Sequence, residues 1–154
     1  MKGDAEVIKI LNEVLTGELT AINQYFLHAA MCKDWGYAKL AAKVHEESID
    51  EMKHAQQLVD RVLFLNGVPN LQKLDRLRIG ESVLEQFESD LGLEELALER
   101  LRRGIEVCFT AKDHASRELL EGILASEEEH VDWLEAQIGI IAEIGKEPYL
   151  AEQM

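Results

Sequence analysis

Hydrophobic residues recur along the chain at steps of three and four, the spacing that one face of an α-helix requires. The first stripe runs from Leu11 to Ala29 and predicts a helix over residues 4–34 that begins near Asp4. The second stripe starts at Leu40 and predicts a helix over residues 37–65, which the Gly67 and Pro69 that follow it would end.

Two more long stripes follow in the second half. Ser82 and Glu85 form a capping box, which predicts a helix over residues 82–111. The next stripe is about 120° out of phase with it, so we expect a break between Thr110 and Ser116 and a helix over residues 115–144. Pro148 suits the first turn of a short fifth helix over residues 148–153.

The stretch between the second and third helices, residues 66–81, has no helical stripe. So long a loop in a compact domain needs a reason, and a crossover along a bundle, joining two parallel helices, supplies one. We therefore expect residues 1–154 to be a single all-α domain, a four-helix bundle with one long crossover and a short fifth helix.

Composition narrows the class of protein. The formal net charge of -14 argues against nucleic acid as a partner, because such a surface repels phosphates. No apolar run is long enough for a signal peptide or a membrane span. The spacing of Cys32 and Cys108 suggests neither a metal site nor a disulfide framework, so a reducing cytoplasm is the expected location.

A Glu-x-x-His motif occurs twice, once as Glu51 with His54 and once as Glu127 with His130. Residues three apart share a helix face, so each motif directs a carboxylate and an imidazole the same way. A further glutamate precedes each motif by 33 residues, Glu18 in one case and Glu94 in the other. The two triplets therefore have the same internal spacing, 76 residues apart, and form an internal repeat of candidate ligands.

The hydrophobic stripes place all six of these side chains inside the predicted bundle. Buried carboxylates are unfavourable unless they are paired or bind metal, and no Lys or Arg interrupts the stripes. Four carboxylates with two imidazoles form the ligand set of ferritin-like di-iron bundles. Oxygen and nitrogen ligands without thiolate favour Fe or Mn over a structural zinc site.

The repeat also suggests a role for each ligand. We expect Glu18 and His54 to be terminal ligands of one iron, and Glu94 and His130 to be those of the other. Glu51 and Glu127 would bridge the two ions. The alternative is that these residues lie on solvated helix faces, which the common phase and the doubled spacing disfavour.

Several neighbouring residues have weaker indications. Tyr25 lies two turns after Glu18 on the same face, so it is expected near the site, as a redox or hydrogen-bonding group or as an ordinary core Tyr. Trp133 is interpreted as a core residue. Glu47 could relay iron but is predicted to be solvated. The remaining histidines are interpreted as surface or structural residues: His28, His45 and His114.

The sequence resembles the bacterioferritin family along nearly its whole length. The matching stretches are MKGD at residues 1–4, AINQYFLH at 21–28, ESIDEMKHA at 47–55 and YL at 149–150. The resemblance implies a hollow shell of 24 identical subunits built from dimers, with Fe²⁺ oxidised by O₂ or H₂O₂ at the di-iron centre and stored inside as ferric mineral. A second subunit type and a small electron-donor protein for iron release are further partners that the family allows.

The resemblance also implies a b-type haem shared by two subunits, with Met52 as its axial ligand. Met52 is rotated about 100° from Glu51, so it is expected to point out of the bundle. Two positions depart from the family: Glu46 stands where some members have a His that forms an inner-surface iron site with Asp50, and Leu58 stands where some have a Tyr. The inner-surface site is therefore in doubt.

Two other functions stay open at this point. One is a haem-binding electron-transfer or haem-reserve protein in which the di-iron centre is secondary. The other is a different di-iron carboxylate enzyme, an oxidase or a peroxidase. The lack of a Cys-x-x-Cys motif disfavours the peroxidase.

Overall fold

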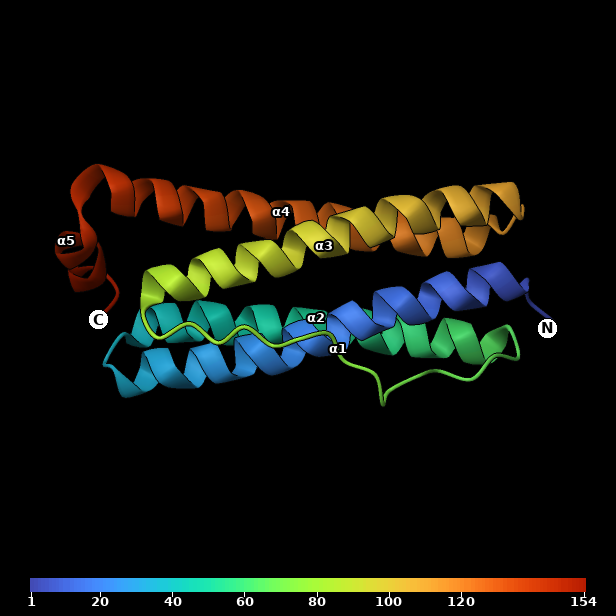
Figure 1. The fold of residues 1–154 in the computed structure, drawn as a ribbon, viewed down its shortest axis with the longest axis horizontal. Coiled ribbons are helices and arrows are strands. Elements are labelled where there is room, and N and C mark those ends of the chain that lie inside the picture. The colour runs from blue at the N-terminus through green and yellow to red at the C-terminus, as the bar shows by residue number, and fades with distance from the viewer.

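The chain folds into five α-helices without β-strands, and the computed structural model describes residues 1–154. The helices are α1 (Ala5–Asp34), α2 (Ala38–Phe64), α3 (Val83–Thr110), α4 (His114–Ile144) and α5 (Lys146–Ala151). The first four form one elongated bundle, and α5 packs at one end of it (Figure 1). The predicted four-helix bundle with a short fifth helix is confirmed.

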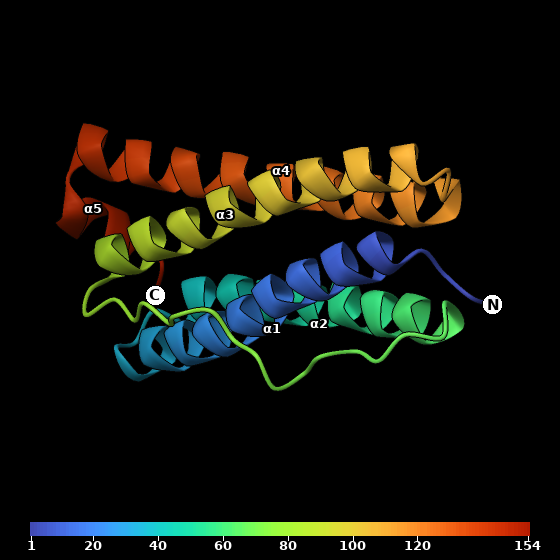
Figure 2. The ribbon, with the colours of Figure 1, turned by 45° about the vertical axis from the view of Figure 1, so that its right-hand side comes forward.

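The helices are arranged in two antiparallel pairs, α1 with α2 and α3 with α4 (Figures 1 and 2). Residues 65–82 return from the end of α2 to the opposite end of the bundle, so that α2 and α3 run in the same direction. This is the crossover between parallel helices that the loop length predicted.

The predicted N-cap residues, Asp4 and Ser82, cap the starts of α1 and α3. Asp4 accepts hydrogen bonds from the backbone N–H groups of Glu6 and Val7, at 2.8 and 3.2 Å. Ser82 accepts one from Glu85 N at 3.3 Å, while the Glu85 carboxylate accepts one from Glu81 N rather than from Ser82 itself. Each contact satisfies an N–H group that a helix start leaves unpaired.

The long helices begin and end within one residue of the predicted boundaries, whereas α5 is displaced by two residues. α4 begins at His114, one residue early, after a turn in which Lys112 has a φ of 59°. α5 begins at Lys146 and ends at Ala151, instead of running from 148 to 153. Gly145, with a φ of 90°, ends α4 and starts α5 directly, so Pro148 is the third residue of the helix. Pro is tolerated there because the first-turn N–H groups need no helical partner.

Asn12 of α1 bonds to the start of the crossover at Val68 and Asn70, and three further side chains of α1 hold the rest of it against the bundle. These three follow one another at steps of four and therefore form one polar stripe. The backbone N–H groups of the crossover donate to them as follows: Asp75 to Thr20 Oγ1 at 2.8 Å, Arg78 to Gln24 Oε1 at 3.0 Å and Gly80 to His28 Nε2 at 3.0 Å. A loop without a strand partner thus has its backbone groups satisfied by side chains.

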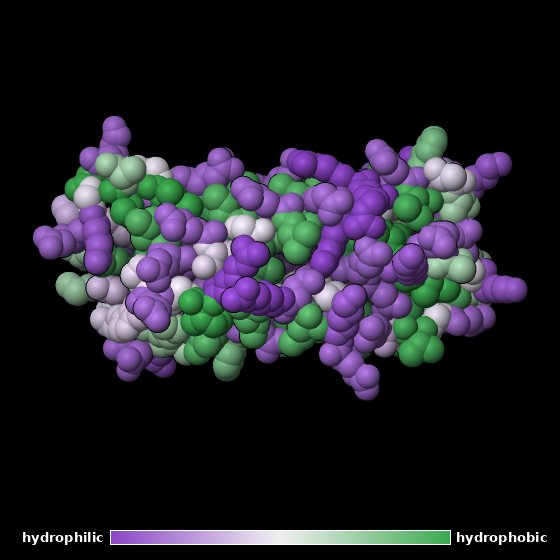
Figure 3. All heavy atoms as spheres, viewed as in Figure 1, coloured by the Kyte–Doolittle hydropathy of each residue, from purple (hydrophilic) through white to green (hydrophobic).

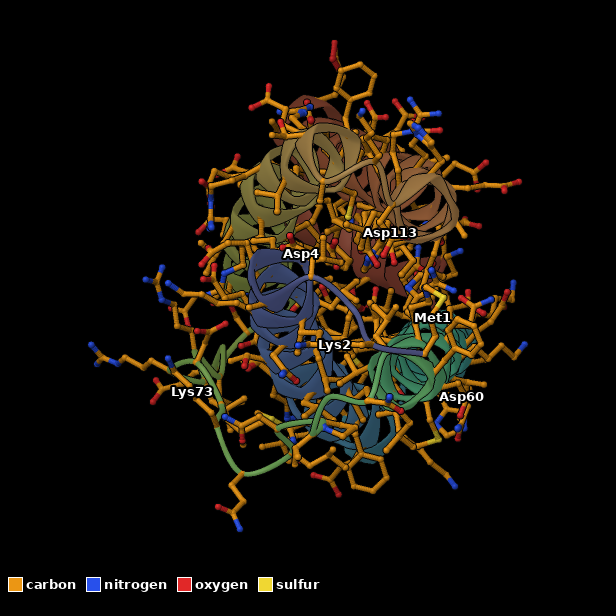
Figure 4. All side chains as sticks on the ribbon, turned by 90° about the vertical axis from the view of Figure 1, so that its right-hand side faces the viewer. Met1, Lys2, Asp4, Asp60, Lys73 and Asp113 are labelled. Carbon is orange, nitrogen blue, oxygen red and sulfur yellow. The ribbon has the colours of Figure 1, made fainter.

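The first residues of the chain lie across the end of α2. The Met1 amino group donates to Phe64 O at 2.9 Å, and Gly3 N donates to Leu65 O at 3.0 Å. Viewed along the bundle, this segment runs from Met1, beside α2, to Asp4 at the start of α1 (Figure 4). A positive amino group close to the C-terminal end of a helix also complements the helix dipole.

The core consists of two apolar clusters of 12 buried residues each. One includes Leu11, Leu58 and Leu120, and the other includes Tyr25, Phe87 and Leu134. On every long helix the candidate ligands fall between the residues of one cluster and those of the other. The bundle therefore has a buried polar layer near its middle. No helix has an apolar stretch of the length that crossing a membrane requires.

Candidate metal centre

The polar layer contains all six candidate ligands, contributed by four different helices. α1 supplies Glu18, α3 supplies Glu94, and α2 and α4 each supply a Glu-x-x-His pair. The four glutamates are only 1–2% exposed. They are Glu18, Glu51, Glu94 and Glu127. His130 is buried as well, and His54 is partly buried.

The ligand atoms fall into two groups that share two carboxylates. The first group is Glu18, Glu51, His54 and Glu127, and the second is Glu51, Glu94, Glu127 and His130. Within each group the ligand atoms lie within 4.8 Å of one another. The two shared residues, Glu51 and Glu127, are the ones that the sequence repeat predicts as bridges.

Within each group an imidazole nitrogen is close to carboxylate oxygens. His54 Nδ1 is 3.0 Å from Glu127 Oε1 and 3.6 Å from Glu18 Oε2. His130 Nδ1 is 3.1 Å from Glu94 Oε1. Both histidines therefore direct Nδ1, and not Nε2, towards the carboxylates.

Several buried atoms of the layer have no hydrogen-bond partner. They are Glu18 Oε2, Glu94 Oε2 and Glu127 Oε2, while His54 Nδ1 and Glu127 Oε1 lie 3.0 Å from each other. Buried polar atoms in proteins are nearly always satisfied, so such a cluster calls for an explanation. Hard divalent cations bound by these oxygens and nitrogens would provide one, and the donor set fits iron or manganese.

The ionisable side chains of the polar layer have pKa values far from their usual ones. Burial, reinforced by the nearby Glu127 carboxylate, raises the pKa of Glu94 to about 8. Burial alone would lower the pKa of the two imidazoles, but the surrounding carboxylates raise that of His54 to about 10 and that of His130 to about 9. Protons therefore balance the carboxylate charges in the metal-free protein.

Tyr25 lies at the edge of the layer, as its position on α1 predicted. It is fully buried, and its hydroxyl donates a hydrogen bond to Glu94 Oε1. Its ring contacts that of His130 edge to face, with centroids 5.2 Å apart. Burial raises the pKa of the Tyr25 phenol well above its usual value, so the phenol keeps its proton and orients Glu94.

Glu47 lies beside the layer and is not solvated, so that prediction was wrong. It is 9% exposed, and its Oε2 is 3.6 Å from His130 Nδ1. Its other oxygen is 2.9 Å from Lys43 Nζ. The sequence did contain an indication of its burial. Glu47 precedes Glu51 by four residues and therefore lies on the same buried helix face.

The other three histidines and Trp133 are not among the candidate ligands. His28 is fully buried and structural, because it binds the crossover through Nε2 while its Nδ1 lies 2.9 Å from Asp90 Oδ1. His45 and His114 are exposed. Trp133 is partly buried and stacks on the ring of His130, with centroids 6.2 Å apart.

Met52 lies outside the polar layer, in agreement with its predicted direction. Its side chain is on the surface of α2 and is 53% exposed. Glu46 is also exposed, whereas Asp50 is half-buried and lines a hollow of about 610 Å³ between α2 and α4. His54 lines the same hollow, so one end of the polar layer opens towards solvent.

Comparison with known proteins shows the family of this chain. A family model of the ferritin-like domain matches residues 8–144. The chain is 51% identical over 152 residues to bacterioferritin BfrA of Mycobacterium tuberculosis, which covers 99% of this chain and 96% of the relative. It is 52% identical over 151 residues to a bacterioferritin of Streptomyces coelicolor, covering 98% and 90%. It is 46% identical over 149 residues to one of Brucella melitensis, covering 97% and 92%.

The domain match spans most of the bundle, and the relatives are matched over nearly their whole length. The chain therefore belongs to the bacterioferritin family of ferritin-like proteins.

Proposed function

We propose that this protein is a cytoplasmic iron-storage protein that oxidises Fe²⁺ within each subunit and holds the ferric product inside a shell of 24 subunits. Membership of the bacterioferritin family supports iron storage as the general role. The observation that carries the ferroxidase proposal is the pair of overlapping ligand groups, which share Glu51 and Glu127.

Each group would take one Fe²⁺ as substrate. Glu18 and His54 would bind the first ion, Glu94 and His130 would bind the second, and the shared carboxylates would contact both. Four carboxylates carry four negative charges, which balance those of two Fe²⁺ ions. The resulting neutral assembly can be buried, whereas the carboxylates alone cannot.

Holding two Fe²⁺ ions side by side permits a two-electron reaction. Each ion gives up one electron. O₂ that accepts both electrons and two protons becomes H₂O₂, and H₂O₂ that accepts them becomes two water molecules. The protein contributes geometry: Tyr25 fixes the orientation of Glu94, and the hollow beside His54 gives solvent access to one end of the layer.

The test is the rate at which metal-free protein mixed with Fe²⁺ in air gains ferric absorbance. Replacement of Glu18 and Glu94 by Ala removes one carboxylate from each group and should slow the rapid phase at least tenfold. Glu95→Ala is the matched control, because Glu95 is exposed on α3 next to Glu94. A double variant as fast as the wild type would rule out this centre as the site of oxidation.

We also propose that Met52 is an axial ligand of a b-type haem shared by two subunits. Met52 lies one turn after the exposed Ile49, and Phe26 on the adjacent α1 is 63% exposed. A thioether can serve as an axial ligand of haem iron, and exposed apolar side chains suit the apolar faces of the ring. A bound haem would supply an electron path between the outside and the stored iron.

The haem proposal has a spectroscopic test. Protein produced with ample haem should show a Soret band, and Met52→Leu should lose it or shift it. An unchanged spectrum in the variant would remove Met52 as the ligand. A strong haem signal in a protein without rapid iron oxidation would favour the alternative function, a haem-binding electron-transfer or haem-reserve protein.

A further inference from the structure

The two halves of the polar layer have different surroundings, although their ligands repeat at an interval of 76 residues. The same interval pairs Glu47 with Ile123 and Tyr25 with Leu101. Ile123 and Leu101 are apolar and no more than 2% exposed. The half that contains His130 therefore has a carboxylate and a phenol where the half that contains His54 has two hydrocarbon side chains.

Glu47 directs one oxygen towards the His130 half. Its Oε2 is 3.6 Å from His130 Nδ1, and the same nitrogen is 3.1 Å from Glu94 Oε1. Glu47 and Glu94 thus approach the one nitrogen of His130 that faces the carboxylates. A cation held by that nitrogen and by Glu94 would be within reach of Glu47 after a small rotation of its side chain.

The second oxygen of Glu47 has a counter-ion. Lys43 Nζ lies 2.9 Å from Glu47 Oε1 and 5.3 Å from the centre of the Trp133 ring. Trp133 in turn stacks on His130. The Lys43 side chain is 35% exposed, so Glu47 is positioned between the buried layer and a cation that reaches solvent.

This half also contains buried carboxylate oxygens that could bind a cation. Glu94 is 1% exposed, and its Oε2 has no hydrogen-bond partner, although Oε1 binds both Tyr25 and His130. Glu127 Oε2, in the same ligand group, is buried and has no hydrogen-bond partner either. The half therefore contains two buried carboxylate oxygens without a hydrogen-bond partner.

We propose that Glu47 is an additional cation ligand of the Glu94/His130 half, and that Lys43 is the counter-ion that holds it while no cation is bound. This inference rests on the proposed function. It makes the two cation sites unequal, because only the Glu94/His130 half gains a carboxylate that is absent from the repeat. We expect that half to bind divalent cations more tightly than the Glu18/His54 half.

The test is a calorimetric titration of the metal-free assembled protein with Co²⁺, which air does not oxidise in this setting. The wild type should bind two ions per subunit in two steps of different affinity. Glu47→Gln should weaken one step at least fivefold and leave the other within twofold. Glu129→Gln is the matched control, since it removes the same charge from an exposed residue adjacent to His130.

Lys43 provides a second variant with the opposite expected effect. Lys43→Met frees Glu47 from its counter-ion and should tighten the step that Glu47→Gln weakens. Lys39→Met, one turn earlier and exposed, controls for the loss of a positive charge. In the Glu47→Gln background the Lys43→Met effect should disappear, because the two residues act as a pair.

The outcomes separate this inference from the proposed function. Binding of two Co²⁺ by the wild type with an unchanged isotherm in Glu47→Gln would overturn the role of Glu47 alone. Equal weakening of both steps would also overturn it, because Glu47 would then act on the whole layer. A wild type that binds fewer than two ions would contradict the di-iron function itself.

Discussion

Glu18, Glu51, Glu94 and Glu127 are nearly inaccessible to water, and no Lys or Arg lies within 4.0 Å of their carboxylates. In the metal-free protein burial raises the pKa values of Glu51, Glu94 and Glu127, and the neighbouring carboxylates raise those of His54 and His130. Two divalent cations would replace the protons that these groups hold. Under the proposed function, the polar layer would therefore exchange protons for metal ions.

This exchange predicts that metal binding releases protons. Glu94, with a pKa of about 8, and the imidazoles, with pKa values of about 9 and 10, are largely protonated at pH 7 and must lose their protons to act as ligands. Raising the pH towards these values reduces the competition, so the apparent affinity for Co²⁺ should rise between pH 6 and pH 9. A pH indicator in weak buffer should record net proton release at pH 7.

Glu94→Gln offers a check on this reasoning. The amide carries no exchangeable acid proton, so the variant should release fewer protons per bound ion and show a shallower pH dependence. Binding without proton release in the wild type, or an affinity that falls as the pH rises, would contradict the assigned protonation states.

Among the elements of the fold, the crossover is held in place by the polar stripe of α1, which consists of Thr20, Gln24 and His28. Replacement of Gln24 by Leu leaves Arg78 N–H without its acceptor and removes the donor that lies 2.8 Å from Asp90 Oδ1. Each hydrogen bond contributes about 0.5–1.5 kcal/mol, so the loss of both costs about 1–3 kcal/mol. Hydrogen exchange in residues 74–80 should therefore accelerate by about 5- to 150-fold, as measured by mass spectrometry.

Asn23→Ala is the control for the crossover. Asn23 is exposed on the same helix, and its side chain bonds only to Leu19 O within α1. Unchanged exchange in the Gln24 variant, or equal acceleration in both, would show that the crossover is held by apolar contacts instead.

Periodicity could predict the four long helices because each stripe is long and continuous. That the six candidate ligands meet in one layer could be predicted because they lie on the apolar stripes, and because Glu18 and Glu94 repeat the same spacing to their Glu-x-x-His partners. Glu47 was misjudged because a single glutamate on a helix is usually solvated. Its distance of four residues from Glu51 was a sufficient signal for burial.

The attachment of the crossover was beyond the sequence argument. Thr20, Gln24 and His28 do repeat at steps of four, but their partners are backbone N–H groups of a loop with no periodicity of its own. Side-chain patterns cannot reveal where such a loop docks. The start of α5 was misplaced for a related reason, because Gly145 serves as the end of one helix and the cap of the next.

At the scale of the whole molecule, the surface combines acidic charge with exposed hydrophobic residues. The chain has a formal net charge of -14, which attracts cations. Hydrophobic residues are scattered among hydrophilic ones on the face shown in Figure 3. The crossover contributes Leu71, Leu74 and Leu77, which are 40–56% exposed. Such residues suit contacts between subunits.

The shell proposal predicts the size of the particle. The purified protein should sediment and scatter light as an assembly about 24 times the 17.4 kDa mass of the chain, and electron microscopy should show a hollow sphere. Iron that stays with this particle through size-exclusion chromatography would support storage. A monomer or dimer as the largest species would contradict storage and favour another di-iron oxidase or a peroxidase.

The most direct test of the account is the stoichiometry of rapid iron oxidation. Metal-free protein is mixed in air with increasing amounts of Fe²⁺, and the amplitude of the fast ferric signal is recorded. The account predicts saturation at two Fe²⁺ per subunit in the wild type and loss of the whole fast phase in Glu51→Ala with Glu127→Ala, because both ions depend on these carboxylates. Saturation at one ion per subunit, or a fast phase that survives in the double variant, would contradict the shared two-iron centre.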